Sequence, residues 1–188
     1  MSDPARRLAT WEDLACLDEG GAVEIVGGEI IEMGRPLARH GRFQAGLSRF
    51  ISGPFDFDED PGGWWILIEP DVRLGPHDIV EPDVVGWRRE RMPEVPETRP
   101  IDVVPDWVCE VRSPSTARHD RLLKAPPYLR AGVAHLWIAD PDARVLEAWA
   151  NQGGAWVSLG AWGDGHRARI PPFEAVELDV GKLFTPLR

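Results

Sequence analysis

Residues 105–116 read Pro105-Asp106-Trp107-Val108-Cys109-Glu110-Val111-Arg112-Ser113-Pro114-Ser115-Thr116. The segment 107–112 is short, apolar and β-prone, which is typical of a central strand. The Ser-Pro-Ser-Thr run that follows is typical of a helix start. We therefore predict a central strand at 107–112 and then a helix that carries Asp120, Leu122, Leu123 and Lys124.

Two charges interrupt the apolar pattern of this strand. Residues two apart in a strand share a face, so Glu110 and Arg112 are expected to point the same way as Val108. A buried charge is costly unless it is paired or bound to a metal ion. The sequence therefore leaves two interpretations open, a metal site at Glu110 or an ion pair between Glu110 and Arg112.

The chain on the N-terminal side of this strand predicts four kinds of element. Thr10 begins a short helix, and Gly27-Gly28 joins residues 23–26 and 29–33 as a β-hairpin. The spacing of the apolar residues in 39–51 predicts an amphipathic helix. After a turn-rich loop, strands are expected at 64–69, 72–74 and 79–87, and a long surface loop at 88–105.

The chain on the C-terminal side predicts more strands, at 136–139, 145–149, 156–159 and 175–178, and a helical turn at 180–184. This order indicates an α/β (α+β) mixed sheet with flanking helices and an N-terminal β-hairpin. We expect the nine tryptophans to serve mainly in core packing. The length of 188 residues favours one domain over residues 1–188.

Composition limits the class of protein. Hydrophobic residues make up 43% of the chain, enough for a core, and no apolar run is long enough to span a bilayer. With no signal-peptide pattern, we expect a cytoplasmic protein that does not interact with a membrane. Cys16 and Cys109 are expected to be small buried apolar residues, because their spacing fits neither a disulfide framework nor a zinc site.

The formal net charge of −10 counts against broad, non-specific binding of nucleic acid, which depends on lysine and arginine. It does not exclude a nuclease, because a carboxylate cluster that holds metal ions is itself acidic and the metal restores positive charge. Arginines and a lysine between 112 and 130 are expected either to face phosphates or to form a solvated helix face.

A second acidic motif, Glu81-Pro82-Asp83, lies in the expected strand 79–87. If that strand lies beside the strand of Glu110, the carboxylates of Asp83 and Glu110 converge. Two adjacent carboxylates bind a hard divalent cation such as Mg²⁺, which prefers oxygen ligands. The alternatives from the residues alone are a turn acid at Asp83 and a structural ion pair at Glu110.

After residue 116 the chain continues with Asp120, Lys124, Tyr128, Gly132-Val133, Trp137 and Asp140-Pro141. Together with residues 105–116, this long ordered pattern resembles the Uma-type (Uma-two) endonuclease-like family of the PD-(D/E)XK nuclease superfamily. The resemblance extends to the hairpin, His40, Glu81-Pro82-Asp83 and the ending Leu183-Phe184, and so covers nearly the whole chain.

The resemblance implies a restriction-endonuclease-like core, a homodimer, and an endonuclease that hydrolyses phosphodiester bonds in DNA with Mg²⁺ or Mn²⁺. It implies that Asp83 and Glu110 are metal ligands. The lysine of the superfamily normally follows the second acid by two residues, where this chain has Arg112. The family's lysine lies in the next helix, which makes Lys124 the catalytic candidate, with Arg112 as the substitute.

Two departures from the family pattern are visible. Arg112 does not deprotonate in proteins, so it can stabilise phosphate charge but cannot serve as a general base. Pro126 and Pro127 fall where the family's helix continues, which predicts a kink or a helix end near Lys124. These departures keep open a second hypothesis, an inactive nuclease-fold protein that binds a partner or nucleic acid. A third hypothesis is metal-dependent hydrolysis of RNA or a small phosphoester.

Residues near the N-terminus are further candidates. An acid from the hairpin often completes such sites, which makes Glu32, or Glu29, a third metal ligand; the alternative for each is a solvent-facing strand residue. His40, at the start of the first long helix, is expected to contact phosphate or metal, or else to serve as a helix cap or surface residue.

Overall fold

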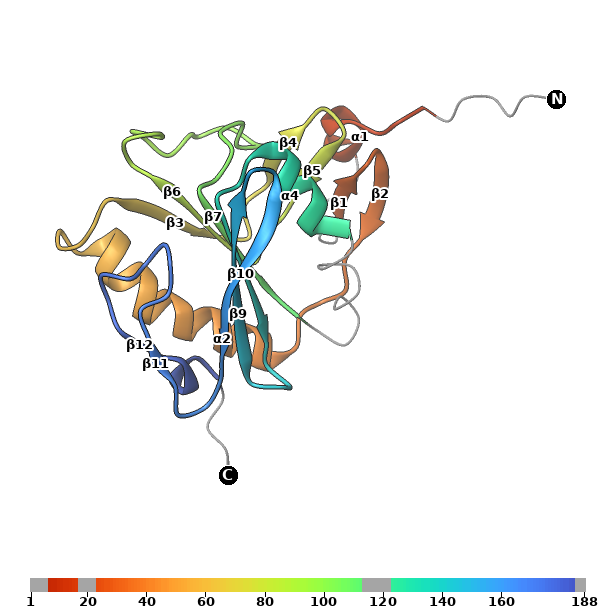
Figure 1. Ribbon diagram of the computed structural model, residues 1–188. Coiled ribbons are helices and arrows are strands. Elements are labelled where there is room, and N and C mark those ends of the chain that lie inside the picture. Colours follow the sequence, from red (N-terminus) through yellow and green to blue (C-terminus); the bar gives the residue numbers. More distant parts are fainter. Residues whose placement is uncertain (1–6, 17–22, 113–122, 185–188) are drawn as a thin grey trace.

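The computed structural model describes residues 7–16, 23–112 and 123–184 (Figure 1). Its main sheet has six strands in the order β10-β9-β8-β7-β6-β3. These strands are β3 (Trp64–Ile68), β6 (Val84–Arg88), β7 (Trp107–Val111), β8 (His135–Asp140), β9 (Val145–Gln152) and β10 (Ala155–Trp162). β7 and β8 are parallel and the other neighbours are antiparallel, so the predicted mixed sheet with a central strand at 107–112 is confirmed.

A smaller sheet in the order β2-β1-β5-β4 lies beside the first. It is built from β1 (Val23–Val26), β2 (Glu29–Glu32), β4 (Val72–Gly75) and β5 (Asp78–Val80). Gly27 and Gly28 both have positive φ, +60° and +79°, which glycine adopts without steric cost. The predicted N-terminal hairpin is therefore confirmed.

The predicted single strand at 79–87 is wrong. The chain leaves the small sheet after β5 and enters the large sheet at β6, with Glu81-Pro82-Asp83 as the crossover. Pro82 has no backbone N–H to donate to a sheet, so pairing is interrupted there. The crossover places Asp83 at the point where the two sheets separate.

Helices complete the fold. They are α1 (Trp11–Ala15), α2 (Ala38–Leu47), the π-helical segment η1 (Ser48–Phe57), α4 (Ala125–Ala131) and the 3₁₀ turn η3 (Val180–Leu183). β11 (Arg167–Ala168) pairs with β12 (Leu178–Asp179) just before η3. The predicted helix at 39–51 is confirmed and continues as η1 into the expected loop. The predicted helix start at 113–122 lies outside the described residues.

The two faces of the large sheet carry separate hydrophobic clusters. Trp107, Cys109 and Val111 face α2 and η1, whereas Val108 faces α4, as the alternation of β7 predicts. Figure 1 shows α2 on one side of the sheet and α4 on the other. Glu110 is therefore directed toward the α4 side.

Aromatic rings fill the α2 side of the sheet. Trp107, Trp137 and Phe173 meet edge to face, with ring centroids 4.8–5.6 Å apart. Such contacts add to the apolar area that the rings bury. Core packing is thus confirmed for these two tryptophans.

The cysteines differ in burial. Cys109 is buried in β7 as predicted, but Cys16 is exposed. The prediction for Cys16 was wrong because α1 is a short surface helix without buried residues.

Candidate active site

Asp83 lies at the start of β6, directly beside β7. The two strands pair antiparallel with Val84 opposite Cys109, which brings Asp83 next to Glu110 along the ladder. Oδ2 of Asp83 accepts a hydrogen bond from the backbone N–H of Val111 at 2.5 Å. The condition stated from the sequence, that the strand of Asp83 lies beside the strand of Glu110, is therefore met.

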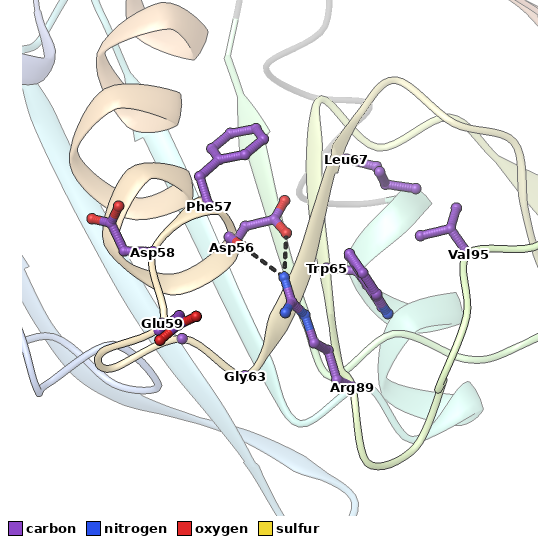
Figure 2. A pocket seen from close by; sticks show the side chains of 10 residues that line it. Asp56, Phe57, Asp58, Glu59, Gly63, Trp65, Leu67, Arg89 and Val95 are labelled. Atoms are coloured by element: carbon purple, nitrogen blue, oxygen red, sulfur yellow. Dashed lines mark hydrogen bonds and ion pairs between the residues drawn. The ribbon is translucent and has the colours of Figure 1, made fainter.

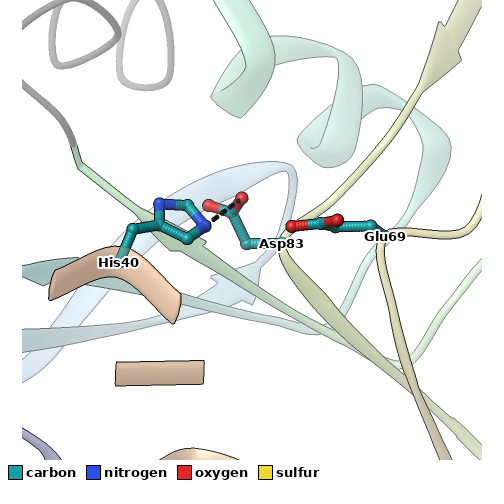
Figure 3. Close-up of side chains that lie close together, drawn as sticks. All are labelled: His40, Glu69 and Asp83. Carbon is teal, nitrogen blue, oxygen red and sulfur yellow. Dashed lines mark ion pairs between the residues drawn. The ribbon is translucent and has the colours of Figure 1, made fainter. Parts of the chain in front are cut away.

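His40 and Glu69 approach Asp83 from either side (Figure 3). Nε2 of His40, in the first turn of α2, lies 3.0 Å from Oδ1 of Asp83. One ligand atom from each of His40, Glu69 and Asp83 lies within 4.8 Å of the others. Because an imidazole and two carboxylates are suitable ligands for a divalent cation, this donor set fits a metal ion.

The backbone at Glu69 supports this interpretation. Glu69 has φ of +51°, a left-handed conformation that few non-glycine residues adopt. Such conformations persist where the surrounding structure fixes them, often at functional sites. Nε2 of Gln44 donates to Oε1 of Glu69 at 2.8 Å and to the backbone oxygen of Asp83 at 3.2 Å, and so joins the two acids.

A buried ionic cluster lies on the α4 side of the same strand ends. Nζ of Lys124 is 2.8 Å from Oε1 of Glu110 and 2.8 Å from Oε1 of Glu24. All three side chains are at most 2% exposed. The ammonium also lies 3.4 Å from the backbone oxygen of Glu81. An ammonium has three N–H donors, and these three acceptors lie within reach of them.

The local sequence explains how Lys124 reaches this place. α4 begins directly after Lys124, and Pro126 and Pro127 lie in its first turn. Proline is tolerated there, because the N–H groups of the first turn have no partner within the helix. Leu123 and Lys124, directly before α4, are π-helical, so the helix changes its hydrogen-bonding pattern near Lys124, where the sequence predicted a kink or a helix end.

Tyr128 completes the cluster one turn further along α4. Its hydroxyl donates to Oε1 of Glu110 at 2.5 Å, and both side chains are buried. Burial first, and then the charge of Glu110, raise the pKa of Tyr128 well above its usual range. Tyr128 therefore stays neutral and serves as a hydrogen-bond donor to Glu110.

Tyr128→Phe is expected to lower the free energy of unfolding by about 1.5–3 kcal/mol, since it removes a hydrogen bond to a buried charge. Urea unfolding of the two proteins measures this. Phe43→Leu, a core change without a polar group, is a control for general loss of packing. A loss below about 0.5 kcal/mol would contradict the contact.

Because Tyr128 is the only tyrosine of the chain, phenolate absorbance near 295 nm reports on it alone. We expect no phenolate in the folded protein at pH 10–11, because the pKa of this hydroxyl is raised. Phenolate is expected to appear only when far-ultraviolet circular dichroism shows unfolding. Titration of the folded protein near pH 10 would contradict the buried contact with Glu110.

Arg112 lies beyond the end of β7 and is not the partner of Glu110. Its Nη1 donates to Oδ2 of Asp140 at 3.1 Å, at the end of β8. The ion pair with Glu110 that the sequence left open is therefore absent. Nε of Arg112 is buried and has no hydrogen-bond partner among the described residues, so this side chain has donor capacity to spare.

Glu32 lies away from these groups. In the hairpin register Glu24 is opposite Ile31 and Glu32 is opposite Val23, so Glu32 points to the other face from Glu24. Glu32 is also exposed, whereas Glu24 is 1% exposed. The hairpin therefore brings Glu24, and not Glu32, to Glu110 and Lys124.

Sequence reasoning missed Glu24 and Glu69. Glu24 is a charge within the apolar run Val23-Glu24-Ile25-Val26, and the argument applied to Glu110 would have identified it. Glu69 precedes Pro70 in a turn, where an acid is common, so local sequence offers no signal.

The pKa of Glu81 is raised by its surroundings. Burial first, and then the charges of Asp71, Glu69 and Glu24, raise its pKa to about 7, although Lys124 acts in the opposite direction. Folding therefore favours the protonated carboxyl group of Glu81. The resulting contribution to the free energy of unfolding is complete below pH 4.5, the pKa of this group in the unfolded chain, and is lost as the pH rises through about 7.

Glu81→Gln is accordingly expected to raise the melting temperature relative to wild type at pH 8 in EDTA, with the difference shrinking toward pH 5. Thermal melts across this range measure it. Glu90→Gln, at an exposed position after β6, is expected to show a smaller pH-dependent difference. A constant offset between wild type and Glu81→Gln from pH 5 to 8 would refute the raised pKa.

A family model described as "Uma2: Putative restriction endonuclease" matches residues 10–181. The chain belongs to this Uma2 family. A solved structure described as a putative nuclease belonging to DUF820 from Anabaena variabilis ATCC 29413 is similar, with a TM-score of 0.76 and 21% identity. The alignment covers 94% of this chain and 97% of that chain. A search of the curated proteins gave no match.

Membership of the Uma2 family and the shared fold confirm the resemblance stated from sequence and support a nuclease. The restriction-endonuclease-like family also indicates a nucleic-acid substrate. Among the described residues, no helix is long and apolar enough to cross a bilayer.

Proposed function

We propose that this Uma2 protein is a metal-dependent endonuclease that hydrolyses phosphodiester bonds in DNA. The observation that carries the proposal is the convergence of two groups at the adjacent ends of β6 and β7. Asp83 lies there with His40 and Glu69, and Glu110 lies there with Lys124.

Asp83 and Glu110 are the ligands that we assign to Mg²⁺ or Mn²⁺, with Glu69 and His40 beside them. Glu69 replaces Glu32 as the further acid, because Glu32 points away from the cluster. When bound, such an ion lowers the pKa of a coordinated water and offsets charge on the phosphate under attack.

The cationic residues take different parts. Lys124 is a positioning residue, since its ammonium lies between Glu24, Glu110 and the backbone oxygen of Glu81 and is not directed at a substrate. Arg112 is about a quarter exposed and has donor capacity beyond Asp140, so we assign it to the phosphate. A guanidinium suits this task because its fork of donors matches phosphate oxygens.

Calorimetric titration with Mg²⁺ and Mn²⁺ tests the proposed metal site without a choice of substrate. Wild type is expected to bind, and Asp83→Asn and Glu110→Gln are each expected to weaken binding at least about tenfold. Asp102→Asn, which removes a carboxylate from an exposed loop, is the matched control. No binding by folded wild type would argue against a preformed site.

The net charge of −10 favours one alternative, a nuclease-fold protein that binds a partner or nucleic acid without catalysis. Metal binding without cleavage of single-stranded or duplex DNA would support it. The homodimer and the cytoplasmic location remain predictions, and light scattering after gel filtration tests the first.

A further inference from the structure

A basic hollow lies where η3 packs against α2, away from the acidic groups described above. It has a volume of about 390 Å³. We call it the α2–η3 hollow, and its lining residues are Arg42, Arg49, Phe50, Gly181, Lys182 and Phe184. Of the described residues that line the hollow, three are cationic and none is acidic, in a chain with 31 acidic and 21 basic residues.

Two of the cations are available to a ligand. Arg42 and Arg49 are exposed, and neither forms an ion pair with a carboxylate of the described residues. Arg42 donates only a long hydrogen bond, 3.4 Å, to the backbone oxygen of Lys182. Lys182 contributes less, because its ammonium lies 3.5 Å from Oδ2 of Asp179. The unbalanced charge of the hollow therefore rests on the two arginines.

Gly46 permits this arrangement. A Cβ atom at position 46 would lie 3.0 Å from the backbone oxygen of Leu183 and 3.2 Å from Nη1 of Arg42. Glycine thus lets η3 approach α2 closely and leaves space for the guanidinium beside it. The phenyl rings of Phe50 and Phe184 add an apolar wall, which strengthens the attraction between the guanidiniums and an anion.

A larger hollow of about 590 Å³, between η1 and β3, shows the opposite chemistry (Figure 2). Its lining includes Asp56, Asp58 and Glu59 and a single cation, Arg89. Arg89 donates to Asp56 at 3.1 Å, so its charge is already balanced. Phosphate is repelled there, which leaves the α2–η3 hollow as the better anion site of the two.

The α2–η3 hollow is related to the candidate active site through α2. Arg42 and Arg49 lie on one flank of the helical segment that begins near His40. Arg42 is two residues from His40, about 200° around the helix, so the two exposed arginines lie on the opposite side of the helix from the buried His40.

We propose that the α2–η3 hollow binds a backbone phosphate of the same DNA molecule that is cleaved at Asp83. This inference rests on the proposed function, because it assumes that DNA lies across the ends of β6 and β7. Arg42 and Arg49 supply the charge, and the contact positions the strand without reading its sequence.

Binding of a fluorescein-labelled duplex in EDTA, measured by anisotropy over a series of salt concentrations, tests the proposal. Arg42→Gln/Arg49→Gln is expected to raise Kd roughly tenfold or more at 0.1 M salt. The slope of log K against log salt is expected to become shallower by about 0.9, since the contact with one phosphate is lost. Arg91→Gln/Arg167→Gln removes the same charge from exposed positions elsewhere and is the matched control.

A change confined to Arg42→Gln/Arg49→Gln supports the proposal. An unchanged slope for that variant, or an equal loss in the control, overturns it. Wild type that binds no duplex overturns it as well. Hydrolysis of bis(4-nitrophenyl) phosphate by wild type with Mn²⁺ then tests the catalytic centre separately, because this diester is too small to reach the hollow.

Discussion

Lys124→Met is expected to lower the free energy of unfolding by about 3–5 kcal/mol. The substitution keeps the length of the side chain but leaves Glu24 and Glu110 buried and facing each other without the cation between them. Removing one partner of a buried ion pair lowers the free energy of unfolding by more than the intact pair adds to it, because the remaining charge is left buried without an opposite charge. Urea unfolding at pH 7 measures the loss.

The chain offers a direct control, since Lys124 and Lys182 are its only lysines. The side chain of Lys182 is 61% exposed and 3.5 Å from Asp179, so Lys182→Met is expected to cost less than about 1 kcal/mol. Adding Glu24→Gln to Lys124→Met is expected to recover part of the stability, because one of the two facing charges is removed. Equal stability losses for the two lysine variants would contradict the buried cluster.

Asp83→Asn is expected to lower the rate of DNA cleavage about 10³-fold, which corresponds to about 4 kcal/mol of lost transition-state stabilisation. Asparagine keeps an oxygen for the N–H of Val111 but removes the charge that faces His40. The fold is therefore expected to remain, and a neutral amide is a poorer ligand for a divalent cation than a carboxylate.

Initial rates on a plasmid with Mg²⁺, and again with Mn²⁺, measure this effect. Asp102→Asn makes the same change in charge at a side chain that is 71% exposed, and its rate is expected to match that of wild type. Circular dichroism establishes that each variant is folded. Cleavage by Asp83→Asn at the wild-type rate would exclude Asp83 as an essential ligand.

The local pattern of the sequence was sufficient for most elements. Alternation in β7 separated Val108 from Trp107 and Cys109, and glycines at 27 and 28 identified the hairpin. These features depend on periodicity and on backbone freedom, which neighbouring residues set. The resemblance to Uma-type proteins, and not spacing, selected Asp83, Glu110 and Lys124 among many acids and bases.

Two features of the fold could not be predicted from the local pattern alone. Proline at 82 ends one strand and precedes another in a different sheet, because the two sheets need that crossover. Pro126 and Pro127 lie in the first turn of α4, directly after the π-helical residues Leu123 and Lys124, and the structure decides how the helix changes there.

The sequence by itself thus determined the class of fold, the central strand and the Uma2 membership of this chain. Only the tertiary structure decided that Lys124 lies between Glu24 and Glu110, and that Glu69 and His40 meet at Asp83. The physical reason is that a buried charge takes the partner that packing brings within about 3 Å. That partner is set by strand register and sheet order, which no local window of sequence contains.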